Sequence, residues 1–249
     1  MRQPLKYAIE WIEQRRPSRV VALTGAGISA ESGIPIFRGP GGLWENHRPE
    51  ELATPGAFAR DPLLVWRWYE WRRDLVRRAS PNAAHEALAR LEGALAGRGD
   101  LTLVTQNVDG LHRRAGSRSI LELHGNLFRV RCPREGTVEE RLEPLGELPP
   151  ICSCGSMLRP DVVWFGEMLP SGILEAAMAA VRSADLLLVI GTSGVVHPAA
   201  GLVSLLEVGE AIEINPDETP ISELARFSIR GSATEVVPSI VEAIEGGQR

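Results

Sequence analysis

The turn that follows the first apolar run of the chain has the spacing of a nucleotide-binding loop. Residues 20–24 lead directly into Gly25-Ala26-Gly27-Ile28-Ser29-Ala30, a G-x-G-x-x-A pattern. Glycine lets the backbone approach a pyrophosphate, and the start of the following helix would offer amides and a positive dipole. Glycine turns after strands are also common, so a purely structural turn stays open. An ordinary dehydrogenase is excluded, because residues 31–39 read as a loop and lack the acidic residue expected about 20 positions later.

Histidine suits the role of a general base near neutral pH. The histidines of the chain are His47, His85, His112, His124 and His197. His47 lies in a polar loop and His85 early in an amphipathic helix, so both are expected to be structural. His112 and His197 adjoin apolar residues, which favours a buried, hydrogen-bonded role. His124 follows a short strand-like run, and we expect its ring to stand at a strand end.

Three cysteines lie close together in the sequence, at Cys132, Cys152 and Cys154. An odd number in a chain that we expect to be cytoplasmic does not suggest a disulfide framework. Glu135 lies three positions after Cys132, so three thiolates and a carboxylate could complete a tetrahedral metal site. Cys-x-Cys is a tight bite, however, and carboxylate is the poorer ligand. The alternative is a degenerate site whose fold survives through packing alone.

The composition is that of an ordinary globular protein, with 44% hydrophobic and 24% charged residues among 249. A net charge of −5 argues against nucleic acid as the main partner, since phosphate binding needs a basic surface. The sequence has no apolar run approaching the roughly 18–20 residues that span a bilayer, and its start lacks the layout of a secretion signal. We expect a cytoplasmic monomer that binds neither membrane nor nucleic acid.

The elements that must position these residues alternate between strand and helix. The apolar runs at residues 20–24, 101–105, 186–190 and 211–214 are hydrophobic on both faces, as strands in a parallel sheet are. Helical spacing follows Ser80-Pro81 and recurs after Ser171, where the polar residue is a favourable start for a helix. This alternation predicts an α/β fold, a Rossmann-like doubly wound parallel sheet.

Two stretches interrupt the alternation. Residues 40–78 contain a Trp- and Arg-rich helix opened by Asp61-Pro62, and residues 127–165 hold all three cysteines. We expect these two insertions to pack together as a small second lobe. The nucleotide-binding domain then comprises residues 1–39, 79–126 and 166–249. A ligand is expected in the cleft between the lobes.

Further motifs follow the glycine-rich turn in a fixed order. They are Gly33-Ile34-Pro35-Ile36-Phe37-Arg38, Gln106-Asn107-Val108-Asp109-Gly110-Leu111-His112, Leu123-His124-Gly125, Val163-Trp164-Phe165-Gly166-Glu167, Gly191-Thr192-Ser193 and Ile214-Asn215. Together with residues 25–29, and from about residue 20 to residue 240, they closely resemble the sirtuin family in its bacterial form. The resemblance implies an NAD-dependent protein lysine deacylase, an enzyme that consumes NAD as a co-substrate.

The resemblance also implies a role for individual residues. Cofactor binding falls to Gly25, Ala26, Gly27, Ser29 and Ala30 at the pyrophosphate, Phe37 and Arg38 over the nicotinamide end, Gln106, Asn107 and Asp109 at the ribose and nicotinamide, and Gly191, Thr192, Ser193, Asn215 and Ala233 at the adenosine half. Catalysis falls to His124 as the base, together with Asn107 and Asp109.

The implied reaction begins when nicotinamide leaves and the amide oxygen of an acyl-lysine attacks the ribose carbon. A ribose hydroxyl, deprotonated by His124, then attacks the resulting imidate, and the products are free lysine and O-acyl-ADP-ribose. Two other functions stay open: a mono-ADP-ribosyltransferase, which would not need an acyl-lysine, and a non-catalytic NAD-binding sensor. Intact Asn107, Asp109 and His124 argue against the sensor.

Substrate binding is implied at two places. Residues 162–167 read as a core strand, and in sirtuins this segment, here with Val163, Trp164 and Phe165, pairs with the extended substrate peptide. Tyr69 and Arg72 are three apart and so share a helix face. By pattern alone the simpler interpretation is a solvated face that bears the arginine, with the aromatic residues packed inward. A Tyr-x-x-Arg pair here nevertheless resembles the subgroup that accepts acidic acyl groups. It implies desuccinylase and demalonylase activity beside deacetylase activity.

Sirtuins typically hold one structural zinc with two Cys-x-x-Cys pairs, in a zinc-ribbon-like segment. The chain departs from this pattern at Cys132-x-x-Glu135 and Cys152-x-Cys154. The resemblance therefore implies a zinc site at these cysteines without deciding whether the metal is bound. Zinc here would be structural and away from the chemistry.

Overall fold

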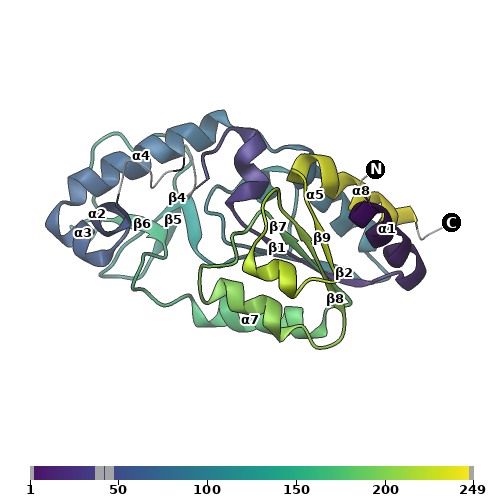
Figure 1. Ribbon diagram of the computed structural model, residues 1–249. Coiled ribbons are helices and arrows are strands. Elements are labelled where there is room, and N and C mark those ends of the chain that lie inside the picture. Colours follow the sequence, from purple (N-terminus) through teal and green to yellow (C-terminus); the bar gives the residue numbers. More distant parts are fainter. Residues whose placement is uncertain (1–2, 37–41, 43–47, 247–249) are drawn as a thin grey trace.

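The computed structural model describes residues 3–36, 42 and 48–246 of the chain. Its main sheet is parallel, with strand order β3-β2-β1-β7-β8-β9 (Figure 1). The strands are β1 (Arg19–Thr24), β2 (Asp100–Thr105), β3 (Ile120–Glu122), β7 (Leu186–Ile190), β8 (Glu210–Ile214) and β9 (Phe227–Ile229). The predicted doubly wound sheet is confirmed. The sequence pattern missed β9, because three residues with one fully buried side chain carry too short a signal.

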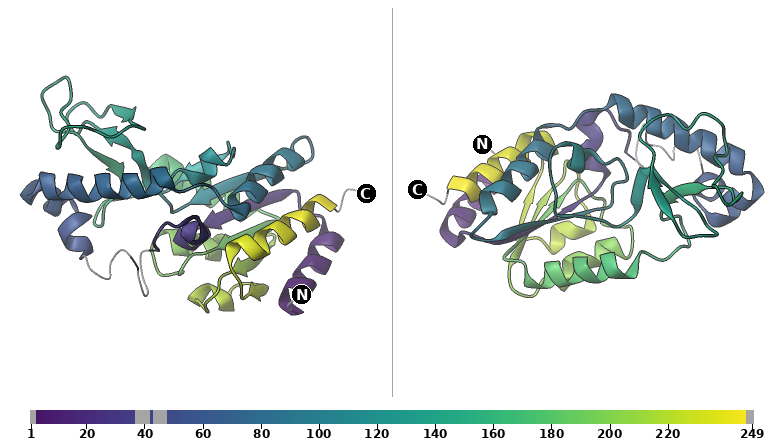
Figure 2. Two further views of the ribbon diagram at one scale, coloured as in Figure 1. Left: turned by 90° about the horizontal axis from the view of Figure 1, so that it is seen from above. Right: turned by 180° about the vertical axis from the view of Figure 1, so that it is seen from behind.

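Helices cover both faces of this sheet (Figures 1 and 2). One face packs against α1 (Gln3–Arg15), α5 (Ala83–Leu95) and α8 (Ala233–Gly246), and the other against α7 (Ser171–Ser183) and the 3₁₀ helix η2 (Ala199–Leu205). Successive side chains of β1 alternate between the two cores: Val20 and Ala22 lie in the first, Val21 and Leu23 in the second. This alternation explains why the strands are hydrophobic on both faces.

The start of α5 differs from the expectation. Asn82, rather than Ser80, is its N-cap, and the Asn82 side chain accepts a hydrogen bond from the Ala84 amide at 3.0 Å. The polar residue nearest the helix supplies the cap, because only its side chain reaches the unsatisfied amides of the first turn.

The second lobe has an antiparallel sheet with strand order β5-β4-β6, packed against a long helix (Figure 1). Its elements are α2 (Pro49–Leu52), α3 (Pro55–Arg60), α4 (Pro62–Arg78), β4 (Gly125–Arg131), β5 (Val138–Glu140) and β6 (Arg159–Val162). Asp61 caps α4 as expected, accepting from the Leu64 amide at 2.9 Å. Trp66 and Arg73 of α4 donate to the carbonyl oxygens of Leu158 and Leu127 in the sheet layer.

These elements enclose a separate hydrophobic core, which includes Trp66, Leu127, Leu158 and Trp164. On that ground we propose the division expected from the sequence, with residues 40–78 and 127–165 as the small lobe. The main lobe also contains the short helix α6 (Leu111–Arg114) and the 3₁₀ helix η3 (Pro220–Glu223). No helix in the described parts of the chain is both long and apolar enough to cross a membrane.

The expectation that residues 162–167 form a core strand is wrong beyond Val162, where β6 ends. The next amides bond to other segments: Val163 donates to the His124 carbonyl oxygen and Phe165 to that of Ala53, each at 2.9 Å. Trp164 is buried, whereas Phe165 is 45% exposed. The Val163 bond extends the pairing of Gly125 with Val162 by one residue, and the segment then leaves the small sheet, with Phe165 bonded to the loop between α2 and α3.

Candidate active site

The carboxyl ends of the parallel strands open into a cavity of about 520 Å³, next to the small lobe. The cavity lies where the strand order reverses, since β1 is bordered by β2 on one side and by β7 on the other. Open α/β sheets characteristically bind ligands at such a switch point. Residues of both lobes line it, among them Gly25, Gln106, His124, Tyr69 and Trp164. The expected cleft is therefore present.

The glycines of the first turn are required chiefly by the turn after β7. A Cβ on Gly27 would lie 2.7 Å from the Cα of Gly191. A Cβ on Gly25 would lie 2.8 Å from the carbonyl oxygen of Gly191. Gly191 itself has a φ of +60°, a conformation that L side chains rarely adopt. The Gly25 amide donates to the carbonyl oxygen of Ile190, and the Gly27 amide donates to that of Gly191. These two amides are therefore engaged within the protein, contrary to the expectation of free amides at the start of the helix.

The segment after this turn is the short 3₁₀ helix η1 (Ala26–Ser32). Ala26 and Ala30 line the main cavity, whereas Ser29 lies behind it, against a smaller adjoining cavity. Phe37 and Arg38, expected over the nicotinamide end, lie outside the described residues.

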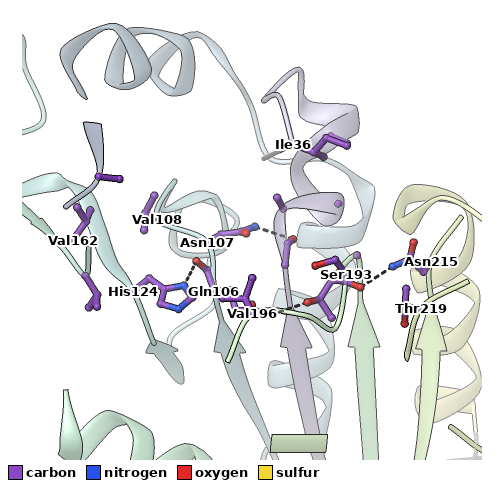
Figure 3. A pocket seen from close by; sticks show the side chains of 18 of the residues that line it. Ile36, Gln106, Asn107, Val108, His124, Val162, Ser193, Val196, Asn215 and Thr219 are labelled. Carbon is purple, nitrogen blue, oxygen red and sulfur yellow. Dashed lines mark hydrogen bonds between the residues drawn. The ribbon is translucent and has the colours of Figure 1, made fainter. Parts of the chain in front are cut away.

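The expected adenosine-binding residues Gly191, Thr192, Ser193, Asn215 and Ala233 all line the cavity. Thr192, which follows β7, is hydrogen-bonded to residues after β2 and β8. Its hydroxyl accepts from Gln106 Nε2 at 2.9 Å, and its carbonyl oxygen accepts from Asn215 Nδ2 at 2.8 Å. Figure 3 shows Gln106, Ser193 and Asn215 along one wall.

A buried polar network lies below the glycine-rich turn. Asn107 Nδ2 donates to the Gly25 carbonyl oxygen at 3.1 Å and to Ser29 Oγ at 3.2 Å, and Ser29 Oγ donates to Asp109 Oδ2 at 2.8 Å. Burial raises the pKa of Asp109, against the hydrogen bonds from the Leu111 amide and from Ser29. Asn107 borders both cavities, whereas Asp109 borders only the smaller one.

His124 follows β3 and faces the main cavity, where Figure 3 shows its ring beside Gln106. Its Nδ1 lies 2.9 Å from the carbonyl oxygen of Gln106. A carbonyl only accepts, so Nδ1 carries the hydrogen and Nε2 keeps a lone pair in the neutral ring. Burial lowers the pKa of His124, although the Gln106 carbonyl opposes this. The neutral ring therefore predominates at pH 7 and can accept a proton.

The other histidines divide into buried and exposed. His85 and His112 are buried, as a structural role requires, and burial lowers the pKa of His85 to about 4 and that of His112 well below its ordinary value. His112 Nε2 lies 3.0 Å from Thr24 Oγ1. The buried role expected of His197 is wrong, because it is an exposed residue on the cavity wall. His47 lies outside the described residues.

Tyr69 and Arg72 are 2% and 8% exposed and both line the cavity. The solvated position that the pattern alone favoured for Arg72 is therefore wrong, whereas the inward packing expected of the aromatic residue is confirmed for Tyr69. The Arg72 guanidinium lies 4.8 Å from the ring centroid of Trp68. Burial lowers the pKa of Arg72, and Tyr69 and Asp109 oppose that effect. The surrounding wall is largely apolar, with Val108, Val162, Val163 and Trp164.

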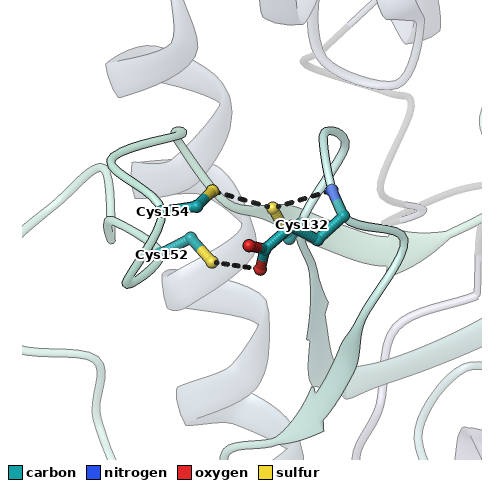
Figure 4. Close-up of side chains that lie close together, drawn as sticks. Cys132, Cys152 and Cys154 are labelled. Carbon is teal, nitrogen blue, oxygen red and sulfur yellow. Dashed lines mark hydrogen bonds between the residues drawn. The ribbon is translucent and has the colours of Figure 1, made fainter.

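The three cysteines and Glu135 converge in the small lobe, where Figure 4 shows Cys132, Cys152 and Cys154 close together. One ligand atom from each lies within 4.8 Å of all the others. Cys132 Sγ is 3.6 Å from Cys154 Sγ, and Cys152 Sγ is 3.5 Å from Glu135 Oε2. A tetrahedral zinc with Zn–S of about 2.3 Å and Zn–O of about 2.0 Å separates its ligand atoms by about 3.8 Å and about 3.5 Å. The four side chains therefore fit zinc.

The sequence patterns missed part of the cavity wall, including Thr219, Ser232 and the segment 216–218. The Thr219 hydroxyl accepts from the Ile221 amide at 3.1 Å and caps η3. Thr219-Pro220 is a recognisable helix start, and it was the available signal for a turn beside Asn215.

Comparison with known proteins agrees with this geometry. The Sir2 family model matches residues 25–198. The chain is 53% identical to the NAD-dependent protein deacylase 2 of Pyrobaculum aerophilum over 90% of each chain, and 52% identical to the NAD-dependent protein deacylase of Thermus thermophilus over 87% of each. A solved Sir2 homologue–NAD complex superposes with a TM-score of 0.87 at 50% identity, covering 97% of this chain and 94% of the other. The chain belongs to the Sir2 family.

Proposed function

We propose that this protein is an NAD-dependent protein lysine deacylase, which releases nicotinamide and transfers the acyl group to ADP-ribose. The observation that carries the proposal is the position of His124. Its Nδ1 is committed to Gln106, so its Nε2 can accept a proton within the cavity bordered by the glycine-rich turns and by Tyr69 and Arg72. The family relatives named as NAD-dependent protein deacylases support it.

Different residues of the cavity bind NAD, orient its reactive end and remove the proton. NAD, once bound, supplies an electrophilic ribose carbon as its nicotinamide leaves. The turns at Gly25 and Gly191 hold the dinucleotide, and Asn107 and Asp109 orient the ribose and nicotinamide end. His124 removes a proton from a ribose hydroxyl, which is a general-base step suited to a neutral imidazole. The buried wall keeps water from competing with the acyl-lysine oxygen.

The acyl pocket favours acidic acyl groups beside acetyl. Arg72 and Tyr69 place a guanidinium and a phenol in an otherwise largely apolar pocket. A purely apolar pocket would reject the distal carboxylate of succinyl- or malonyl-lysine through desolvation, whereas a guanidinium can bind it with two hydrogen bonds. We therefore propose desuccinylase and demalonylase activity as well as deacetylase activity.

The substrate peptide docks along Val163, Trp164 and Phe165. The backbone N–H groups of these residues already donate to the His124 carbonyl oxygen, the Glu167 carboxylate and the Ala53 carbonyl oxygen. A docked peptide therefore uses its own amides to donate to carbonyl oxygens of this segment. Such backbone pairing gives loose sequence preference.

Zinc binds at Cys132, Cys152, Cys154 and Glu135, and it cross-links the turn between β4 and β5 to the segment before β6. The metal content of purified protein tests this proposal, with one zinc per chain expected by mass spectrometry. Glu135→Ala should weaken zinc retention against a chelator by at least about 10-fold, and Glu135→Cys should restore it. Glu140→Ala, which removes an exposed carboxylate from β5, is the matched control. Equal retention by all four proteins would exclude Glu135 as a ligand.

The main test offers NAD with acetyl-, succinyl- and malonyl-lysine peptides in parallel. Mass spectrometry then scores freed lysine, nicotinamide and O-acyl-ADP-ribose, with His124→Ala as the blank. Transfer of ADP-ribose to a protein would appear as a mass gain on the target instead. Absence of nicotinamide release with every peptide would refute the proposed activity. The cytoplasmic location, the monomeric state and the lack of nucleic-acid binding stay predictions from the sequence.

A further inference from the structure

We propose that Trp164 sets the direction in which the Tyr69 hydroxyl donates its hydrogen bond, and thereby makes the acyl pocket selective for acyl groups that end in an acceptor. Trp164 Nε1 lies 2.9 Å from Tyr69 Oη. Both side chains are buried, and they come from different parts of the chain. The inference rests on the acyl pocket of the proposed function and adds a positioning residue to it.

The direction of this hydrogen bond follows from the chemistry of its two groups. An indole N–H can only donate, so the Tyr69 oxygen must be the acceptor. A phenol hydrogen lies near the plane of its ring and has two in-plane positions. The Trp164 N–H occupies the acceptor position on one side, which leaves the hydroxyl hydrogen on the other. Because Tyr69 lines the cavity, we assign that hydrogen to the bound acyl group.

The protonation state of Tyr69 supports this assignment. Burial raises the pKa of Tyr69, and Arg72 and the Trp164 N–H only partly oppose that effect. The phenol is therefore neutral at physiological pH and retains a hydrogen to donate. Tyr69 and Arg72 are then both hydrogen-bond donors at the acyl pocket, and a carboxylate can accept from them whereas a methyl-terminated acyl chain cannot.

The indole of Trp164 is held in place from several sides. The Arg159 guanidinium lies 3.6 Å from its ring centroid, and Arg159 forms two hydrogen bonds with Glu167, at 2.6 and 2.9 Å. Glu167 also accepts from the Trp164 backbone amide at 2.8 Å. The ring of Phe58 packs against the indole with centroids 5.2 Å apart. A cation over an indole face draws electron density toward itself, which strengthens the N–H as a donor.

A buried indole N–H needs a hydrogen-bond partner even in a residue that only forms a wall of the pocket, so the positioning role must be tested by its effect on substrate choice. The test therefore separates the N–H group from the bulk of the side chain. Trp164→Phe removes the donor, and Phe58→Leu loosens the packing against the same indole while the donor stays. Tyr69→Phe removes the group through which Trp164 is proposed to act. The double variant Trp164→Phe/Tyr69→Phe completes a mutant cycle.

Each purified protein is assayed with NAD and with succinyl- and acetyl-lysine peptides, and the ratio of the two kcat/KM values is the readout. Trp164→Phe should lower the succinyl-to-acetyl ratio about 10-fold, mainly through the KM of the succinyl peptide. Phe58→Leu should change the ratio by less than about 2-fold. In the Tyr69→Phe background, the Trp164 substitution should change it by less than about 2-fold as well.

The outcomes distinguish this inference from the function on which it rests. If the wild-type protein cleaves acetyl-lysine but not succinyl-lysine, the acidic-acyl pocket is wrong and the role of Trp164 is wrong with it. If succinyl cleavage is present and Trp164→Phe lowers the ratio equally with or without Tyr69, only the role of Trp164 is overturned. Should Trp164→Phe fail to fold, β-(3-benzothienyl)alanine at position 164 keeps the shape and replaces N–H by sulfur, with the same ratios expected.

Discussion

Replacement of Arg72 by methionine is the sharpest perturbation of the proposed acyl preference. Methionine keeps an unbranched side chain of similar reach but removes the charge and all five N–H donors. Arg72 is 8% exposed, so water can do little to replace the lost interaction with a bound carboxylate. Its contact with the Trp68 ring is lost for every substrate alike, and therefore cancels from a comparison between acyl groups.

The magnitude follows from the hydrogen bonds at stake. A hydrogen bond to a charged group contributes about 1.5–3 kcal/mol. Loss of a two-pronged clamp, with Tyr69 still in place, should cost about 3–4 kcal/mol of transition-state stabilisation for a succinyl substrate. At about 1.4 kcal/mol per factor of ten, kcat/KM for succinyl-lysine should fall roughly 100- to 1,000-fold. Acetyl-lysine has no carboxylate to lose, so its kcat/KM should fall less than about 10-fold.

The assay measures nicotinamide release from NAD with matched acetyl- and succinyl-lysine peptides. Arg67→Met is the control, because Arg67 is an exposed residue of the same helix and does not border the cavity. It should leave the succinyl-to-acetyl ratio within about 2-fold of wild type. Equal losses on both substrates in Arg72→Met would refute the clamp, since the residue would then support the pocket without recognising the acyl group.

Three further predictions test other parts of the structure. Gly27→Ala places a Cβ 2.7 Å from the Gly191 backbone, so it should lower the free energy of unfolding by about 1–3 kcal/mol and raise the KM for NAD. Urea denaturation measures the loss of stability. Gly172→Ala is the control and should leave the stability unchanged, because its Cβ meets nothing within 4 Å. The pKa of Asp185 is about 2, because partial burial, which raises it, is outweighed by hydrogen bonds from the start of β1. Its carboxylate therefore stabilises the fold above about pH 4 and ceases to do so as the pH falls toward 2. With its side chain 28% exposed, Asp185→Asn should cost about 1–2 kcal/mol at pH 7 and almost nothing at pH 2, and a pH-independent difference would contradict this. Because burial lowers the pKa of His124, the acidic limb of the kcat/KM profile should lie below pH 6.5; a midpoint above that value would show that another group titrates.

Local sequence patterns determined the main sheet and much of the candidate site. The runs that became β1, β2, β7 and β8 are hydrophobic on both faces because helices cover both sides of the sheet. A parallel sheet brings the carboxyl ends of its strands to one edge. The motifs that directly follow those strands, from Gly25 to Asn215, therefore lie together at a single cavity.

The tertiary structure alone decided what depends on contacts between distant segments. Tyr69 and Arg72 point into the cavity because α4 packs across the small sheet, although their spacing fits a solvated face equally well. The strand-like segment after Val162 leaves the small sheet, because the Phe165 amide finds its acceptor at Ala53, in a loop that is remote in sequence. Spacing in a sequence fixes which side chains share a face. Which way that face turns depends on the packing of elements that are remote in sequence.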